Sequence, residues 1–214
     1  TPKYNLKLAT LPGLTAGFVN AAGFLGFALL TTNITGHAAL LAEGIAQQNW
    51  LYAQVYTIWM LLSLAGAFTC GIFISLFGAH QRYSYTIPIL IEITMLVLSA
   101  LYGHNYDGTI VSKIVFAGSL LFAMGLQNAL VSMISGSVVR TIHLTGTFTD
   151  LGIELAQLVN TKLKDRTGLF TKIKRKLFII CSFISGAMAG AYIFQRIGFT
   201  SFYAPVLILI FALF

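Results

Sequence analysis

The sequence contains long apolar stretches that carry almost no charge, and these stretches limit the possible folds more than any other feature. Crossing the hydrocarbon core of a bilayer takes about 20 helical residues. In lipid every backbone group must find a partner within the chain, so a spanning segment is a helix or a strand of a closed barrel. The stretches are apolar on all faces and do not alternate with period two, which favours helices. We therefore predict an all-α, polytopic membrane protein.

The composition excludes a water-soluble globular domain. Charged residues make up 9% of the 214 residues, whereas an ordinary globular domain carries about 25%. The net charge is +7, but the basic residues lie at the ends of the apolar stretches, where they set the orientation in the membrane. We therefore expect lipid as the surrounding partner and no nucleic acid. Cys70 and Cys181 both lie inside apolar stretches, which argues against a disulfide or a thiolate metal site.

Six stretches are candidate membrane spans. They cover roughly residues 11–30, 51–77, 86–102, 111–139, 177–194 and a last stretch that begins near 202. The last stretch reaches the final residue, Phe214, before it is long enough to span, so we expect the natural chain to continue.

Polar residues interrupt the pattern after the first and the fourth stretch. The interruptions are at 31–36 and 140–146, and the segments that follow them are 37–48 and 147–163. The first of these segments is too short to cross unaided and too apolar for a loop in water. We predict that each interruption is a helix break followed by a short half-helix.

The two halves of the chain align with each other over several features in the same order. Gly17-Phe18-Val19-Asn20-Ala21 aligns with Gly125-Leu126-Gln127-Asn128-Ala129, Asn33 with His143, Thr35-Gly36 with Thr145-Gly146, Gly66-Ala67 with Gly186-Ala187, and Pro88 with Pro205. We therefore predict a single membrane domain, 1–214, that contains an internal duplication. Repeat 1 covers about 10–103 and repeat 2 about 111–214.

The charges predict the orientation of the repeats. Three spans per repeat is an odd number, so the second repeat is inverted relative to the first. The loop 162–176 carries seven basic residues, which places this loop and the N-terminus on the cytoplasmic side. If the short segments also crossed, each repeat would have four spans and the repeats would be parallel, but their length and polarity disfavour that alternative.

The aligned segments resemble the YoaK-like family, which comprises bacterial inner-membrane proteins classified as a domain of unknown function. The resemblance rests on Gly17-Phe18-Val19-Asn20-Ala21 with Asn33-Ile34-Thr35-Gly36-His37, and on Met124-Gly125-Leu126-Gln127-Asn128-Ala129 with Leu144-Thr145-Gly146-Thr147. It covers nearly the whole chain, although the family typically has an acidic residue at the place of Asn20. The resemblance implies a small polytopic membrane protein of the bacterial inner membrane, for which transport is often assumed and no substrate is assigned.

The two Thr-Gly breaks are the predicted substrate site. A broken helix exposes unpaired N–H groups at the positive end of a helix dipole. Thr35 and Thr145 have suitable side chains for N-caps, and Gly36 and Gly146 would let a ligand approach the backbone. Two such ends facing each other suit an anionic group. The alternative is that both Thr-Gly pairs simply start short helices at the membrane surface.

Other polar residues complete the predicted site. Asn33 and His143 precede the two threonines at equivalent places and offer both donors and acceptors. His37 and Thr147 directly follow the two glycines. Three amides within the first and fourth spans either line the same cavity or connect helices by hydrogen bonds: Asn20, Gln127 and Asn128.

Four carboxylates are candidates for coupling transport to a proton gradient. Ionisable groups at membrane depth are costly, so they are functional candidates by default. Glu92 lies inside the third span, and Glu43 lies in the first short segment. Asp150 and Glu154 are one helical turn apart in the second short segment. The alternative for these two is that they face water or pair with Arg140 and the basic loop.

Four glycines within the spans are expected to allow close packing of helix backbones: Gly66, Gly71, Gly186 and Gly190. Packing within one chain and packing across a homodimer both stay open.

We expect a small secondary transporter or permease of the bacterial inner membrane that moves a small, preferably anionic, metabolite between two inverted repeats. The sequence contains no phosphate loop, metal-ligand cluster or nucleophile motif of the usual forms, so we expect no enzyme, no cofactor and no metal. The alternative function is a non-transporting membrane subunit, scaffold or assembly factor. A lipid-modifying enzyme that uses His143 with Asp150 or Glu154 is a third hypothesis.

Overall fold

The computed structural model describes residues 2–78, 83–134, 144–160 and 166–213, and these residues form helices joined by short connections, without a strand. The elements are α1 (Pro2–Phe27), α2 (Ile34–Ala46), α3 (Trp50–Phe77), α4 (Tyr83–Tyr102), η1 (Gly103–Asn105), α5 (Ile110–Ile134), α6 (Leu144–Asn160), α7 (Arg166–Ile197), η3 (Gly198–Phe202) and α8 (Tyr203–Leu213). The all-α prediction is therefore confirmed for the described residues.

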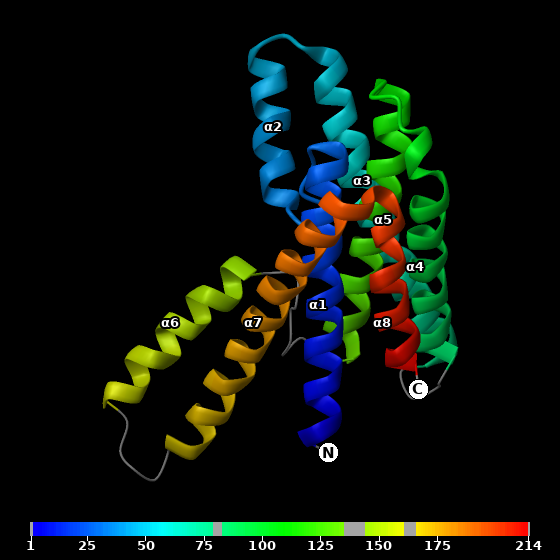
Figure 1. The fold of residues 1–214 in the computed structure, drawn as a ribbon. Helices are drawn as coiled ribbons and strands as arrows, with labels where there is room; N and C mark the ends of the chain where they lie inside the picture. The colour runs from blue at the N-terminus through cyan, green and yellow to red at the C-terminus, as the bar shows by residue number, and fades with distance from the viewer. Residues whose placement is uncertain (1, 79–82, 135–143, 161–165, 214) are drawn as a thin grey trace.

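Within the described residues, four helical stretches are long and apolar enough to cross a membrane. They are Trp50–Phe77, Tyr83–Asn105, Ile110–Met133 and Arg166–Leu213. The last stretch contains both α7 and α8, which run in opposite directions on either side of η3 (Figure 1). These stretches support a multi-pass membrane protein.

The two predicted short segments are short helices, but both begin earlier than expected. α2 begins at Ile34 because the Asn33 side chain accepts a hydrogen bond from the backbone N–H of Gly36 at 3.0 Å. The prediction that Thr35 caps this helix is therefore wrong, since Thr35 already lies in its first turn. Thr145 likewise lies inside α6, one residue after that helix begins. Asparagine is among the best N-cap residues, and here it precedes the threonine.

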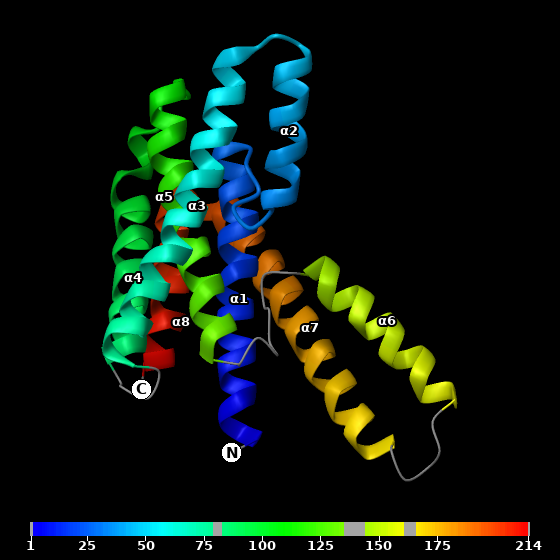
Figure 2. The ribbon, with the colours of Figure 1, turned by 180° about the vertical axis from the view of Figure 1, so that it is seen from behind.

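The helices are arranged as two hairpins around a central bundle (Figures 1 and 2). α2 and α3 form a hairpin that extends to one end of the molecule, and α6 and α7 form a hairpin that extends to the opposite end. α7 packs mainly along α1, and α3 packs mainly along α5. The N-terminus and the beginning of α7 lie at the same end, whereas the α2–α3 turn lies at the other end.

Glycines allow α1 and α7 to cross with their backbones in contact. A Cβ added at Gly17 would clash with the carbonyl of Phe183, and a Cβ added at Gly186 would clash with the carbonyl of Leu14. The contact is reciprocal, because each carbonyl lies three residues before the glycine of its own helix. Gly190 similarly lies against the backbone of Phe18.

The crossing of α3 and α5 repeats this pattern with other residues. A Cβ at Gly66 would clash with the carbonyl of Phe122, and a Cβ at Gly125 would clash with the carbonyl of Ser63. Again each carbonyl lies three residues before the glycine of its own helix. Close packing within the chain is therefore confirmed for Gly66, Gly186 and Gly190, whereas Gly71 has open space around it and makes no such contact with the described residues.

Candidate functional site

A cavity of about 680 Å³ lies where the beginnings of α2 and α6 approach the crossing helices. Pockets for small molecules usually measure about 300–1,000 Å³, so this cavity has a suitable size. Its wall includes six of the residues predicted for the substrate site: Asn20, Asn33, Thr35, Gly36, Asn128 and Thr145. These six residues come from α1, α5, the two short helices and the N-cap of α2, and the fold brings them together from both halves of the chain.

The other predicted substrate residues are placed elsewhere. His37 is buried beside Trp59, with 5.9 Å between the ring centroids, so it connects α2 to α3. Gln127 is buried and donates from its amide nitrogen to the carbonyl of Pro12 at 3.1 Å, which joins α5 to α1. Thr147 is buried and Gly146 is exposed, both in the first turns of α6. His143 lies outside the described residues.

Asn20 positions the segment that enters α2. Its side-chain oxygen accepts hydrogen bonds from the backbone N–H of Thr32 at 3.1 Å and from the Thr32 hydroxyl at 3.0 Å. Both bonds use the oxygen, so the amide nitrogen of Asn20 can donate to a solute. This asparagine therefore shapes the cavity wall and offers it a donor.

Gly36 is required by the cap of α2. A Cβ at this position would lie 2.8 Å from the amide nitrogen of Asn33 and would displace the capping side chain. Gly146, the corresponding residue of α6, has open space around it. The two Thr-Gly pairs thus share a place at the start of a short helix, and among the described residues a capping side chain contacts the first glycine and none contacts the second.

Two polar oxygens at the cavity are buried without a hydrogen-bond partner among the described residues. They are the hydroxyl oxygen of Thr31, whose residue is 1% exposed, and the side-chain oxygen of Asn128. Leaving a buried polar group unsatisfied costs about 1–3 kcal/mol. Both oxygens are covered in this arrangement although their residues line the cavity, so they can bind a solute or a water molecule only when the cavity wall moves.

The cavity wall also contains residues that are not among the predicted substrate residues, such as Thr31, Ser63 and Phe183. Ser63 lies three residues before Gly66, and Phe183 lies three residues before Gly186, so their carbonyls take part in the two crossings. The spacing to the aligned glycines is the signal that could have identified them. All the cavity-lining residues that the structure describes are uncharged.

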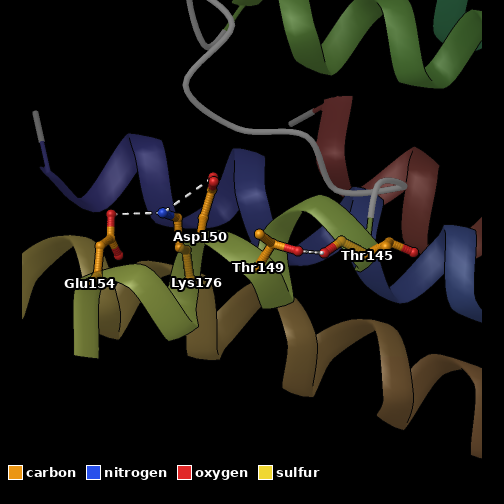
Figure 3. Close-up of polar contacts among 5 residues, drawn as sticks. All are labelled: Thr145, Thr149, Asp150, Glu154 and Lys176. Carbon is orange, nitrogen blue, oxygen red and sulfur yellow. Dashed lines mark hydrogen bonds and ion pairs between the residues drawn. The ribbon is translucent and has the colours of Figure 1, made fainter. Parts of the chain in front are cut away.

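Two of the four candidate carboxylates pair with one lysine of the basic region. The Lys176 ammonium lies 2.7 Å from Glu154 and 3.3 Å from Asp150 (Figure 3). These contacts join α6 to α7, as expected from the alternative in which the carboxylates pair with the basic region. The Asp150 side chain is 60% exposed, whereas those of Glu154 and Lys176 are mostly covered.

The remaining two carboxylates differ in burial. Glu43 is exposed on α2 and accepts a hydrogen bond from the Gln47 side chain at 3.0 Å. Glu92 is fully buried in α4, and neither of its oxygens has a hydrogen-bond partner among the described residues. Neither carboxylate lines the cavity.

Comparison with known proteins places the chain in a family without assigning it an activity. Residues 8–214 match the model of a family described as "Protein of unknown function (DUF1275)". No curated protein and no solved structure matches the chain.

Proposed function

The chain belongs to a family described as a protein of unknown function (DUF1275), and we propose its function from the cavity. The function is that of a small secondary transporter or permease, which moves a small polar metabolite through a site between two inverted repeats of the bacterial inner membrane. The resemblance of the sequence to the YoaK-like family supports the proposed location in the bacterial inner membrane.

The inverted repeats are supported by the two helix crossings. The glycine and carbonyl contacts of α1 with α7 occur with the same spacing in α5 with α3. Under the alignment of the halves, α1 corresponds to α5 and α3 corresponds to α7, so the two crossings are equivalent. The α2–α3 and α6–α7 hairpins extend to opposite ends of the molecule (Figure 1), as inversion requires.

The observation that carries the proposal is the cavity at which both short helices begin. Its wall contains Thr35 and Gly36 from α2 with the N-cap Asn33, and Leu144 and Thr145 from α6. Many secondary transporters bind their substrate at the interface of inverted repeats, where helices are interrupted. Rocking of one repeat against the other would then open the cavity to each side in turn.

The chemistry of the wall favours a solute that has both hydrogen-bond donors and acceptors. Asn20 offers an amide nitrogen, whereas Thr31 and Asn128 offer buried oxygens without a partner among the described residues. The first N–H groups of α2 and α6 carry the positive ends of two helix dipoles. The solute that fits best therefore has an anionic group, which lies next to these helix ends, and a polar body, which lies next to the amide side chains.

The test is a thermal-shift screen of the purified protein in detergent against small carboxylates, phosphates, sugars and amino acids at two pH values. A ligand that binds only the folded state stabilises it by about 2.7 kcal/mol at 100 times its Kd. We expect at least one hit. That hit should be weakened in Asn128→Ala, and an anionic hit also in Asn33→Asp, which keeps a capping residue but adds a negative charge.

Asn105→Ala is the matched control, because Asn105 is exposed in η1 and does not line the cavity. It should leave the thermal shift unchanged. A hit that is equally strong in all variants places the binding site outside this cavity. A protein that folds well and gives no hit argues against transport, and co-purification of a partner protein would then support the alternative of a membrane subunit or scaffold.

A further inference from the structure

The most deeply buried carboxyl group among the described residues is that of Glu92, which does not belong to the cavity. It is 0% exposed and lies on the buried face of α4, which also presents Pro88, Leu96 and Ser99. The apolar side chains of Ile89 and Ile91, which precede it in the sequence, pack against the cluster that contains Cys70 of α3 and Leu126 of α5. Glu92 therefore lies in the middle of an otherwise mainly apolar helix contact.

The carboxyl group has no counter-charge among the described residues. Neither oxygen accepts or donates a hydrogen bond there, and burial of an unpaired ion costs several kcal/mol. Ionisation of the group in this arrangement of helices would therefore leave an uncompensated buried charge. A metal cation is disfavoured, because hard cations require several oxygen ligands and the neighbouring cluster supplies a thiol and apolar side chains.

The ionisable groups on the helices around α4 do not neutralise Glu92. α3 contributes the buried Cys70 thiol, which belongs to the apolar cluster beside α4 and carries no positive charge. The lysine of α5, Lys113, lies in its first turn and lines a separate small cavity with Tyr52 and Tyr56. α8 begins with the exposed Tyr203, η1 carries the exposed His104, and η3 has no ionisable residue.

Glu92 and the solute cavity lie against the same pair of crossing helices. α3 contributes Ser63 to the cavity and Cys70 to the cluster beside α4. α5 contributes Asn128 to the cavity, whereas Leu126 and Leu130 belong to the cluster. A change in the α3–α5 crossing would therefore alter both the cavity wall and the surroundings of the carboxyl group.

Only one half of the molecule carries this group. Glu92 lies four residues after Pro88, and the residue four positions after the aligned Pro205 is Leu209. Leu209 is 3% exposed, so both positions are buried. The second half therefore provides a matched position that cannot bind a proton.

We infer that Glu92 is a proton-binding site, and that loss or gain of its proton is coupled through the α3–α5 crossing to the opening of the solute cavity. An ionised Glu92 needs water or a counter-charge, so it favours arrangements in which α4 separates from α3 and α5. The coupling rests on the proposed transport function, whereas proton binding does not, so the two are tested separately and without a solute.

Proton binding is tested by infrared spectroscopy of the protein reconstituted in liposomes, over a pH titration. We expect a C=O stretching band of a protonated carboxyl group at neutral pH, and we expect this band to be lost in Glu92→Gln, in which an uncharged amide replaces the carboxyl. Leu209→Gln should retain the band. Identical spectra of the wild type and Glu92→Gln in this region would show that Glu92 is ionised and would overturn the proposal.

Coupling is tested by the rate at which a maleimide labels Thr35→Cys at the cavity, in a background with Cys70→Ala and Cys181→Ala. The rate should change with pH, and the midpoint should match that of the infrared band. Adding Glu92→Gln should abolish the pH dependence, whereas adding Leu209→Gln should preserve it. A pH dependence that survives Glu92→Gln overturns the coupling even if the infrared band is assigned to Glu92. If the proposed solute site were absent, the ligand screen would fail while both of these results still held.

Discussion

The α2–α3 hairpin and the α6–α7 hairpin occupy corresponding places in the two halves, but different interactions hold each pair together. The α2–α3 turn is tight: Asn49 donates from its backbone N–H to the carbonyl of Gly44 at 2.8 Å, and Gly44 packs against Ala53. Farther along the pair, His37 contacts Trp59. Within the described residues, neither hydrogen bonds between side chains nor ion pairs connect these two helices.

The α6–α7 hairpin combines ion pairs with apolar packing. Lys176 pairs with both acidic residues of α6 (Figure 3), and Leu151 packs with Ile173 and Ile180. Two glycines of α6, Gly146 and Gly152, face open space. The contrast indicates that α2 is held to its partner helix mainly by close packing, whereas ion pairs add to an apolar cluster in holding α6 to α7.

The glycine crossings are the feature in which the two halves are most alike, so substitutions there have the largest expected effect. Gly66→Ala and Gly186→Ala each place a Cβ against a backbone carbonyl of the opposite helix, and overpacking costs about 1–3 kcal/mol, occasionally more. We expect similar losses of unfolding temperature and folded yield in detergent. Gly71→Ala, in the same helix as Gly66 but in open space, should lose neither. A loss in one half alone would contradict the equivalence of the crossings.

Loss of the ion pair in the α6–α7 hairpin has the next largest expected effect. Lys176→Met leaves Glu154 covered and without its cation, and we expect a cost of about 1–3 kcal/mol, between the values for exposed and buried pairs. Hydrogen exchange should accelerate in α6 and stay unchanged in α2. Lys172→Met, which removes an exposed lysine of the same helix, is the control. Equal exchange of α6 in both variants would show that charge does not hold this hairpin.

The cap of α2 has a smaller expected effect. Asn33→Ala removes the acceptor for the Gly36 N–H, and loss of an N-cap costs about 0.5–2 kcal/mol. Amide exchange should accelerate at the beginning of α2, and Asn33→Asp should keep the slow exchange. Asn49→Ala should cost less, because its bond to the Tyr52 N–H is 3.5 Å long. The reverse order would mean that the turn, rather than the cap, determines where α2 begins.

The smallest effect is expected for the exposed member of the ion pair. Asp150→Asn removes a side chain that is 60% exposed, and exposed ion pairs are worth about 0–1 kcal/mol. The unfolding temperature should fall less than in Glu154→Gln, and the difference from the wild type should shrink at high salt. A larger loss of unfolding temperature for Asp150→Asn than for Glu154→Gln would show that Asp150, and not Glu154, makes the main contact with Lys176.

Much of the fold could be predicted from the sequence because spans and close-packing glycines are local patterns. The second predicted span, 51–77, differs from α3 by one residue at its beginning. Gly66 and Gly186 were recognised because both are followed by alanine in aligned spans. Gly71 is a glycine of the same apolar span as Gly66, but it faces away from the neighbouring helices. Which face of α3 a glycine occupies depends on how the helix is rotated about its axis, and the sequence does not give that rotation.

The site was harder to predict because it depends on backbone geometry and on contacts between distant residues. Asn33 and Thr35 are both good capping residues, and the sequence alone could not decide which of them caps α2. Ser63 and Phe183 lie far from the Thr-Gly pairs in sequence and reach the cavity only through the two crossings. The pairing of Lys176 depends on how α6 lies along α7, which no local pattern states.

The central claim, that the two hairpins belong to inverted repeats, is tested most directly by cysteine labelling from each side of the membrane. Gln47 in the α2–α3 turn and Gly168 in the first turn of α7 are both exposed, so each is suitable for a single labelled cysteine. The background carries Cys70→Ala and Cys181→Ala, so that no other cysteine reacts. If the repeats are inverted, a membrane-impermeant maleimide labels Gly168→Cys only from the cytoplasmic side and Gln47→Cys only from the opposite side. Labelling of both from the same side would contradict the inversion.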